Sequence, residues 1–234
     1  MKPWPNGMPI LSKGGGEGMN PVEFIKEEVL VAVIREATPQ TILPIAEALY
    51  EGGVKVLEIT AETPKFTRLI EVVREEMDGQ VLTGAGTVLD PETARAAIMA
   101  GSEFIVSPSF NPETVKMTKR YGVPSIPGAL TPTEILTAYE LGADMIKVFP
   151  ANTFGPGYVK SLHGPFPSIP LMVTGGINLD NLSDYLEAGA LAVGLGGNLV
   201  NTKQLQHQED FQRLTQKARE YTQIVQKVKA VQTI

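Results

Sequence analysis

The chain has no cysteine, only two histidines, and aromatic residues make up just 6% of its 234 residues. The absence of cysteine excludes disulfide bonds, thiol nucleophiles and cysteine-ligated metals. No stretch approaches the roughly 18 consecutive apolar residues that a membrane-spanning helix needs. The net charge is −6 and there is no basic run, which argues against binding to nucleic acid or to an anionic membrane.

The remaining composition, 43% hydrophobic and 20% charged residues, is typical of one globular unit with enough chain to bury a core. The N-terminus lacks a charged-then-apolar signal pattern, so we expect a cytoplasmic location. Residues 1–18 are rich in proline and glycine, which is linker composition. We interpret them as a flexible extension (a tag, a linker or a start assigned too early) and place a single domain at 19–234.

Short apolar or β-branched runs alternate with amphipathic segments along this domain. Such runs, with little polar alternation, are typical of parallel strands covered on both faces. We expect strands at Val29–Arg35, Val54–Thr60, Val81–Thr87, Phe104–Ser107, Val123–Ile126, Met145–Phe149, Leu171–Thr174 and Leu191–Leu195. The last amphipathic segment, Phe211 to Val228, has helical spacing of its apolar residues.

The expected helices begin in one repeated way, with a capping side chain followed by proline. A Thr, Asp or Asn at the N-cap accepts a hydrogen bond from a free backbone N–H, and proline fits the next position. These pairs are Thr38-Pro39, Thr63-Pro64, Asp90-Pro91, Asn111-Pro112 and Thr131-Pro132. Eight strands, each followed by a helix, predict a single-domain α/β protein, a (β/α)8 TIM barrel, rather than an open doubly wound sheet.

Chemistry in such barrels sits at the carboxyl ends of the strands. The most informative residue there is Lys147, which lies between Ile146 and Val148 in an apolar run. Burial disfavours the ammonium form of lysine, and a neutral amine forms a Schiff base with a carbonyl substrate. The alternative is a lysine that extends its amine into water from the strand end.

Glu58 is the candidate partner of Lys147, on the second expected strand. A carboxylate beside an imine-forming lysine shuttles protons between carbinolamine, imine and enamine. The alternative is a carboxylate that only forms an ion pair with Arg35 or Lys147. The two histidines, His163 and His207, do not lie at strand ends, so we expect no histidine-ligated metal.

Glycine-rich segments follow the last two strands, Thr174-Gly-Gly176 and Gly194-Leu-Gly-Gly197. Barrels commonly bind phosphate at this place through backbone N–H groups. The sequence therefore predicts a phosphate site there. Gly84 and Gly86 on the third strand have a plainer explanation, close packing.

Several motifs together resemble the 2-keto-3-deoxy-6-phosphogluconate aldolases, a family that includes the 4-hydroxy-2-oxoglutarate aldolases. The resemblance runs from about Met19 to about Leu205, and the order of the motifs makes it specific. The motifs are Leu57-Glu-Ile-Thr60, Gly84-Ala-Gly-Thr-Val88, Phe104-Ile-Val-Ser-Pro108, Pro127-Gly-Ala-Leu-Thr-Pro132, Lys147-Val-Phe-Pro-Ala151 and Val173-Thr-Gly-Gly176.

The resemblance implies a homotrimeric class I aldolase that uses no metal or cofactor and cleaves a phosphorylated 2-keto acid into pyruvate and glyceraldehyde 3-phosphate. By matching position, Lys147 is the Schiff-base lysine and Glu58 the general acid/base. For the other site residues we expect roles in binding the substrate (Arg35, Thr87, Phe149 and Thr174) or its phosphate (Gly175, Gly176, Gly196 and Gly197).

Two positions depart from the family and affect the substrate. Glu62 stands where many members have an arginine that binds the substrate carboxylate, and a carboxylate there would repel it. Either Arg35 takes over that role, or Glu62 turns outward, which we expect, or the substrate differs. Gly197 stands where the family often has a phosphate-binding serine. Both changes favour a relaxed aldehyde preference or a 4-hydroxy-2-oxoglutarate substrate.

A function of another class stays open, because barrels host many unrelated functions. The chain could be a phosphate-binding barrel without lyase activity, or an assembly scaffold. The Lys147 and Glu58 pair discriminates between these interpretations, since a binding protein has no need of a desolvated lysine.

Overall fold

The computed structural model describes residues 20–232, so the expectation for residues 1–18 lies outside the described part of the chain. Within it, all the strands that pair do so in parallel. The strands are β1 (Leu30–Ile34), β2 (Val56–Thr60), β3 (Leu82–Gly86), β4 (Ile105–Val106), β5 (Ser125–Ile126), β6 (Gly128–Ala129), β7 (Ile146–Val148), β8 (Leu171–Thr174) and β9 (Ala192–Leu195).

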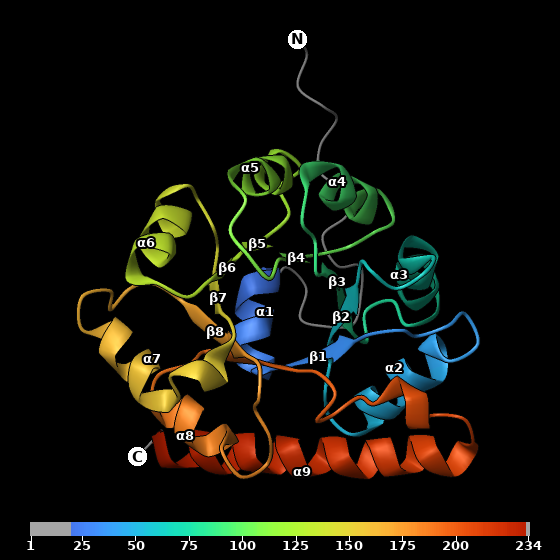
Figure 1. The fold of residues 1–234 in the computed structure, drawn as a ribbon. Coiled ribbons are helices and arrows are strands. Elements are labelled where there is room, and N and C mark those ends of the chain that lie inside the picture. The colour runs from blue at the N-terminus through green and yellow to red at the C-terminus, as the bar shows by residue number, and fades with distance from the viewer. Residues whose placement is uncertain (1–19, 233–234) are drawn as a thin grey trace.

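Helices surround the strands, and α1 lies across the centre of the view in Figure 1. The α-helices are α1 (Pro21–Glu28), α2 (Ile42–Glu51), α3 (Phe66–Glu76), α4 (Pro91–Met99), α5 (Pro112–Arg120), α6 (Pro132–Glu140), α7 (Pro156–His163), α8 (Leu182–Glu187) and α9 (Gln208–Gln232). Two short 3-10 helices, η1 (Ala151–Thr153) and η2 (Thr202–Gln204), precede α7 and α9. The expected final helix is therefore present and extends beyond both of its predicted ends.

The sheet closes into a barrel through a divided fifth strand. Its order is β5-β4-β3-β2-β1-β9-β8-β7-β6, and only Pro127 separates β5 from β6. β5 pairs with β4, and β6 pairs with β7. The backbone N–H of Lys147 donates to the carbonyl of Pro127 at 2.9 Å. Counting β5 and β6 as one strand gives eight β/α units, which confirms the predicted (β/α)8 barrel.

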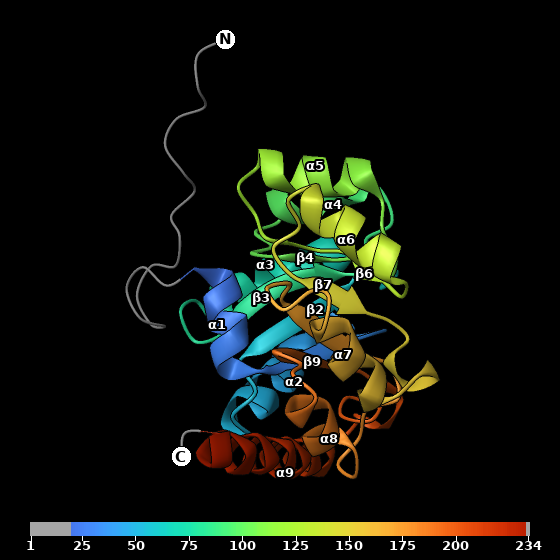
Figure 2. The same cartoon turned by 90° about the vertical axis from the view of Figure 1, so that its left-hand side faces the viewer.

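Helix α1 closes the amino-terminal end of this barrel. It ends two residues before β1 begins, and Figure 2 shows it at one end of the strands. Its Val22 and Ile25 are buried in an apolar cluster inside the barrel, together with Val31, Val56, Leu82, Phe104, Val106, Ile126, Met145, Met172 and Ala192. A second apolar cluster fills the space between the strands and the outer helices. The barrel is therefore packed from its amino end, and only the carboxyl ends of the strands remain for polar side chains.

Three of the five predicted helix caps are confirmed. The side chains of Asp90, Asn111 and Thr131 accept hydrogen bonds from backbone N–H groups in the first turns of α4, α5 and α6. Thr131 and Glu134 form the reciprocal capping box. The backbone N–H groups of Thr131 and Leu130 hold the pKa of the Glu134 carboxyl below its ordinary value.

The other two predicted caps, Thr38 and Thr63, are wrong. Helix α2 begins after Thr41, because Thr38 forms a turn in which its carbonyl accepts the N–H of Thr41 at 3.0 Å. Helix α3 begins at Phe66, and the Thr63 hydroxyl instead accepts the backbone N–H of Glu36 at 3.0 Å. A contact between neighbouring loops thus replaces the local cap at Thr63, and it lies beside the candidate site.

Candidate active site

Lys147 points into the barrel because of its position in β7. Successive side chains of a strand alternate between its faces. Met145 lies in the cluster inside the barrel, while Ile146 and Val148 pack outward against the helices. Lys147 therefore shares the inward face with Met145, one step closer to the carboxyl end. Its side chain is 2% exposed, which excludes the alternative of a lysine that extends into water.

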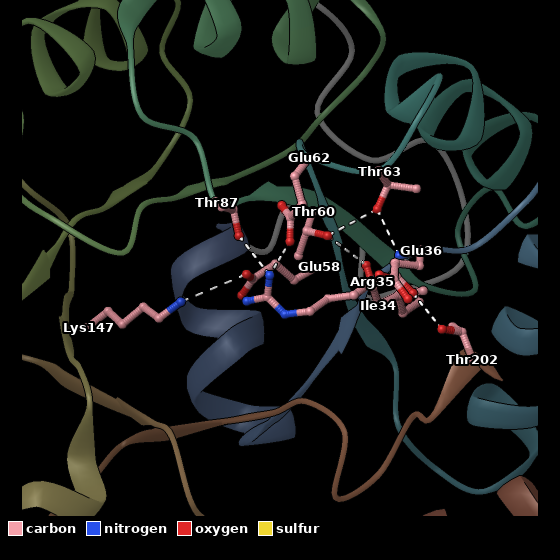
Figure 3. Close-up of polar contacts among 10 residues, drawn as sticks. All are labelled: Ile34, Arg35, Glu36, Glu58, Thr60, Glu62, Thr63, Thr87, Lys147 and Thr202. Atoms are coloured by element: carbon pink, nitrogen blue, oxygen red, sulfur yellow. Dashed lines mark hydrogen bonds and ion pairs between the residues drawn. The ribbon is translucent and has the colours of Figure 1, made fainter. Parts of the chain in front are cut away.

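Glu58 reaches the same region from β2 and is fully buried. Its Oε1 lies 3.9 Å from the Lys147 Nζ, as Figure 3 shows. Neither Glu58 oxygen has a hydrogen-bond partner among residues 20–232. A buried carboxylate without hydrogen bonds is costly, and such exceptions in a folded protein call for an explanation. Proton transfer to a bound molecule supplies one.

Gly86 makes room for the Glu58 carboxylate. A β-carbon at Gly86 would lie 1.8 Å from Glu58 Oε1 and 2.4 Å from its Cδ. Both distances are far below any real contact, so a larger residue at position 86 displaces the carboxylate. Close packing was the plainer explanation of this glycine in the sequence. The sequence did not predict that the packing partner of Gly86 is a candidate catalytic oxygen, Oε1 of Glu58.

Phe149 and Thr174 complete the surroundings of the lysine. The Phe149 ring centroid lies 5.2 Å from Lys147 Nζ, within the range of a cation–π contact. Thr174, at the end of β8, is buried, and its hydroxyl has no hydrogen-bond partner in the described part of the chain. That hydroxyl lies over Gly194 of β9, where a β-carbon would approach it to 2.3 Å. Both residues thus face the barrel interior, as a substrate contact requires.

Arg35, Glu62 and Thr87 meet at the carboxyl ends of the three neighbouring strands β1, β2 and β3 (Figure 3). Arg35 forms an ion pair with Glu62 through its Nη1. The same nitrogen lies 3.4 Å from the Thr87 hydroxyl. Arg35 and Thr87, both expected at strand ends, follow the last residues of β1 and β3 by one position.

Glu62, which was expected to turn outward, has an exposed side chain and a partner there. Its side chain is 42% exposed, but it pairs with the 49% exposed side chain of Arg35. The partners stand 27 residues apart in the chain. Sequence reasoning missed the pair because both residues lie in loops, where no periodicity relates one loop to the next.

The main chain around Arg35 is held by two threonine hydroxyls. Thr202 in η2 donates to the Arg35 carbonyl at 2.8 Å. Thr63 accepts from the backbone N–H of the next residue, Glu36, at 3.0 Å. These contacts join the loops after β1, β2 and β9, so the base of the Arg35 side chain has a defined position.

The predicted phosphate-binding glycines follow β8 and β9, which lie between β7 and β1 in the barrel. Gly175 and Gly176 have φ values of 105° and 73°, a region that favours glycine. A β-carbon at Gly196 or Gly197 would meet no atom of the described residues within 4 Å. The space beside Gly196 and Gly197 is thus unobstructed.

Two other features of the described residues bear on the site. Between residues 20 and 232, no group of three His, Asp or Glu residues is arranged to hold a metal ion, and no helix is long and apolar enough to cross a membrane. A surface groove of about 630 Å³ lies elsewhere, beside η2 and α9, where His207, Asp210 and Arg213 line it. We place the site at Lys147 and Glu58 all the same, because burial and pairing of ionisable groups indicate chemistry better than groove size.

Fold and site together define a (β/α)8-barrel enzyme whose candidate active site lies at the carboxyl ends of the strands. Residues 22–217 match the family described as KDPG and KHG aldolase. The chain belongs to this family and is therefore an aldolase, which is a lyase.

Named relatives differ in the substrate that their names carry. A 2-dehydro-3-deoxy-phosphogluconate aldolase of Pseudomonas aeruginosa is 38% identical over 192 residues, which cover 82% of this chain and 85% of the relative. A 2-dehydro-3-deoxy-6-phosphogalactonate aldolase of Escherichia coli is 35% identical over 176 residues, which cover 75% and 86%. These two identities are too close to choose between the substrates.

A solved structure resembles the whole barrel. It is the KDPG aldolase of Legionella pneumophila, with pyruvate captured at low pH as a covalent carbinolamine intermediate. The TM-score is 0.79 at 29% sequence identity, and the match covers 86% of this chain and 97% of that one.

Proposed function

We propose that this protein is a class I aldolase that cleaves 2-keto-3-deoxy-6-phosphogluconate to pyruvate and glyceraldehyde 3-phosphate through a Schiff base on Lys147. The observation that carries the proposal is the buried pair of Lys147 Nζ and Glu58 Oε1, 3.9 Å apart. The captured carbinolamine of the Legionella pneumophila relative supports the same chemistry, because a carbinolamine forms when an amine adds to a carbonyl.

The first half of the proposed cycle forms the imine. The neutral Lys147 amine attacks the C2 ketone, and a proton passes from its nitrogen to the former carbonyl oxygen to give the carbinolamine. Glu58, in its acid form, protonates the carbinolamine hydroxyl, which leaves as water. The protonated imine remains on Lys147, and Glu58 is left as a carboxylate within reach of the substrate.

The second half breaks the carbon–carbon bond. Glu58 removes the proton of the C4 hydroxyl, and the electrons of the C3–C4 bond move into the imine. This step releases the aldehyde and leaves an enamine. Protonation at C3 and hydrolysis then release pyruvate and restore the amine. The imine accepts the electrons, so the cycle needs no metal as a Lewis acid.

The remaining site residues have binding roles in this proposal. Arg35 and Thr87 bind the carboxylate of the 2-keto acid, since arginine and hydroxyl donors suit a planar carboxylate. Phe149 and Thr174 contact the substrate beside the imine. Backbone N–H groups around Gly175, Gly176, Gly196 and Gly197 bind the phosphate.

A second candidate function is a 4-hydroxy-2-oxoglutarate aldolase or a related 2-keto acid aldolase with relaxed aldehyde preference. The observation that favours it is the pair of open glycines at 196 and 197, which offer no side-chain hydroxyl to a phosphate. Comparison of kcat/KM for the phosphorylated and unphosphorylated substrates decides between the two.

We also propose a homotrimer, and the mass of the assembly in solution tests it.

The decisive experiment traps the imine. Incubation with pyruvate and borohydride is expected to add one reduced pyruvyl group, and peptide mass spectrometry is expected to locate it at Lys147. Lys147→Ala is expected to abolish the adduct without unfolding the protein. Lys203→Ala is the matched control, because the Lys203 side chain is 76% exposed and pairs with Glu36 outside the site. An unmodified wild-type protein rules out the Schiff-base mechanism.

A further inference from the structure

Glu62 forms an ion pair with the Arg35 guanidinium, the group that is proposed to bind the substrate carboxylate. Its carboxylate binds Nη1 of Arg35, and the same nitrogen lies 3.4 Å from the hydroxyl of Thr87. The two residues assigned to carboxylate binding thus meet at one atom, and a carboxylate of the protein itself is bound there. Since Glu62 and a 2-keto acid present the same chemical group, they compete for one donor.

We propose that Glu62 is a built-in competitor for the carboxylate of the substrate, and so a determinant of how tightly this aldolase binds 2-keto acids. The inference rests on the proposed function, because it takes the substrate to be a 2-keto acid that reacts at Lys147. In the free enzyme Glu62 holds Arg35. An incoming carboxylate displaces Glu62, whose side chain then moves into water.

Replacing Glu62 by a substrate carboxylate on Arg35 is expected to cost little free energy. Both side chains are nearly half exposed, and exposed ion pairs contribute little to stability because water and salt screen them. Glu62 therefore regains hydration as it leaves. The main chain at Arg35 is held by Thr202 and, through Glu36, by Thr63, so the arginine stays while its partner changes.

The exchange affects binding and leaves the chemical step unchanged. Glu62 competes only in the free enzyme, and among residues 20–232 its carboxylate is paired with Arg35 and not with Lys147, whose ion-pair partner is Glu58. Its removal is therefore expected to lower the concentration of 2-keto acid that half-saturates the site, with the maximal rate unchanged. A residue that instead oriented Arg35 for the substrate would have the opposite effect when removed. The two roles thus give changes of opposite sign.

The test uses the rate of imine trapping on the full-length protein with cyanoborohydride and two carbonyl probes. Pyruvate carries a carboxylate, and hydroxyacetone is a ketone without one. For Glu62→Gln, the half-saturating concentration of pyruvate is expected to fall about two- to fivefold, the range of an exposed ion pair. The value for hydroxyacetone and the maximal rates are expected to stay the same.

Two controls isolate the competition. Glu36→Gln removes the same charge one residue beyond Arg35, where Glu36 pairs with Lys203 at 3.3 Å, and it is expected to leave both probes unaffected. In an Arg35→Gln background, Glu62→Gln is expected to have lost its effect, since a double-mutant cycle isolates the pairwise contribution.

The outcomes separate this inference from the proposed function. Adducts with an unchanged or raised half-saturating pyruvate concentration in Glu62→Gln overturn the competition and leave the lysine chemistry in place. An equal change for both probes, or for Glu36→Gln, shows a general charge effect and also overturns it. If no variant forms an adduct with either probe, the Schiff-base function itself is wrong and the inference falls with it.

Discussion

The two ends of the barrel are built from the same strands, but one end holds the fold together and the other holds the chemistry. At the amino end, Val22 and Ile25 of α1 pack into an apolar cluster with the first inward residues of the strands. At the carboxyl end, a buried amine and a buried carboxylate face each other. A step of two residues along the chain separates the two layers, from Val56 to Glu58 on β2 and from Met145, just before β7, to Lys147 on β7.

The comparison of the two ends shows that the alternation of side chains along each strand places both the apolar core residues and the active-site candidates inside the barrel. Positions two apart share a face, so the inward apolar residues guarantee that Glu58 and Lys147 also point inward. The apolar layer at the amino end stabilises the barrel. The polar layer at the carboxyl end destabilises it, because buried oxygens there have no hydrogen-bond partner among the described residues. Substitutions at the two ends are therefore expected to separate activity from stability.

The largest expected effect lies at the carboxyl end, at Glu58. Glu58→Gln keeps the shape of the side chain but removes its proton transfer, so we expect kcat to fall about 10²–10⁴-fold. The protein is expected to stay folded, and its free energy of unfolding is expected to fall by less than the roughly 3–5 kcal/mol that the loss of one partner from a closely paired buried ion pair costs, because Lys147 and Glu58 lie 3.9 Å apart. Steady-state kinetics and urea unfolding measure the two quantities. An unchanged kcat means that Glu58 only pairs with Lys147.

The opposite behaviour is expected at the amino end, for Ile25→Ala. Ile25 is fully buried in the cluster that closes the barrel, so the substitution leaves a cavity and lowers the free energy of unfolding by about 2–5 kcal/mol. The folded fraction is expected to retain its kcat. Glu27→Ala on the exposed side of the same helix is the control, with a change within about 0.5 kcal/mol. A large loss of kcat in folded Ile25→Ala protein would show that the two ends are coupled.

The sequence was sufficient to predict the barrel because its signals are local. Apolar runs, caps that are followed by proline, and the positions of Lys147 and Glu58 on strands all depend on residues close together in the chain. The structure brings Lys147 and Glu58 together, and Arg35 and Thr87 at 3.4 Å, as the barrel rule for strand ends suggests.

What the sequence could not show is which groups meet across loops. Thr63 has the form of a helix cap, yet its hydroxyl binds the loop after β1. Glu62 was expected to turn outward, yet it pairs with Arg35 from that same neighbouring loop. In both cases a tertiary contact outweighs the local preference, and the competing partner has no signal near it in the chain.

Gly86→Ala is expected to lower kcat less than Glu58→Gln does, and it is the most specific test of the comparison. Gly86 lies at the carboxyl end of the barrel, beside the catalytic candidates. It has no side chain, so it can act there only through the space that it leaves. The three atoms nearest to an added β-carbon, at 1.8, 2.4 and 2.5 Å, all belong to the Glu58 side chain.

The atom that must give way is thus the flexible end of Glu58, while the β3 backbone has no reason to move. We expect kcat to fall about tenfold to a hundredfold, since a displacement of about 1 Å in a reacting group has effects of that size. The free energy of unfolding is expected to change by less than about 1 kcal/mol. Alanine can adopt the backbone conformation of residue 86, and it lowers the conformational entropy of the unfolded chain.

The Glu58→Gln background distinguishes a displaced carboxylate from a distorted barrel. If Gly86→Ala acts only through the Glu58 carboxylate, it is expected to add little to the loss in kcat once that carboxylate is gone, because two changes to one interaction are not additive. Gly84→Ala is the matched control. Its β-carbon would meet the Phe104 ring at 2.5 Å, so it is expected to lower stability by repacking the apolar cluster. Equal losses of kcat from Gly86→Ala in both backgrounds would mean that position 86 supports the fold and not the carboxylate, and the division between the two ends would then not extend to the glycines of β3.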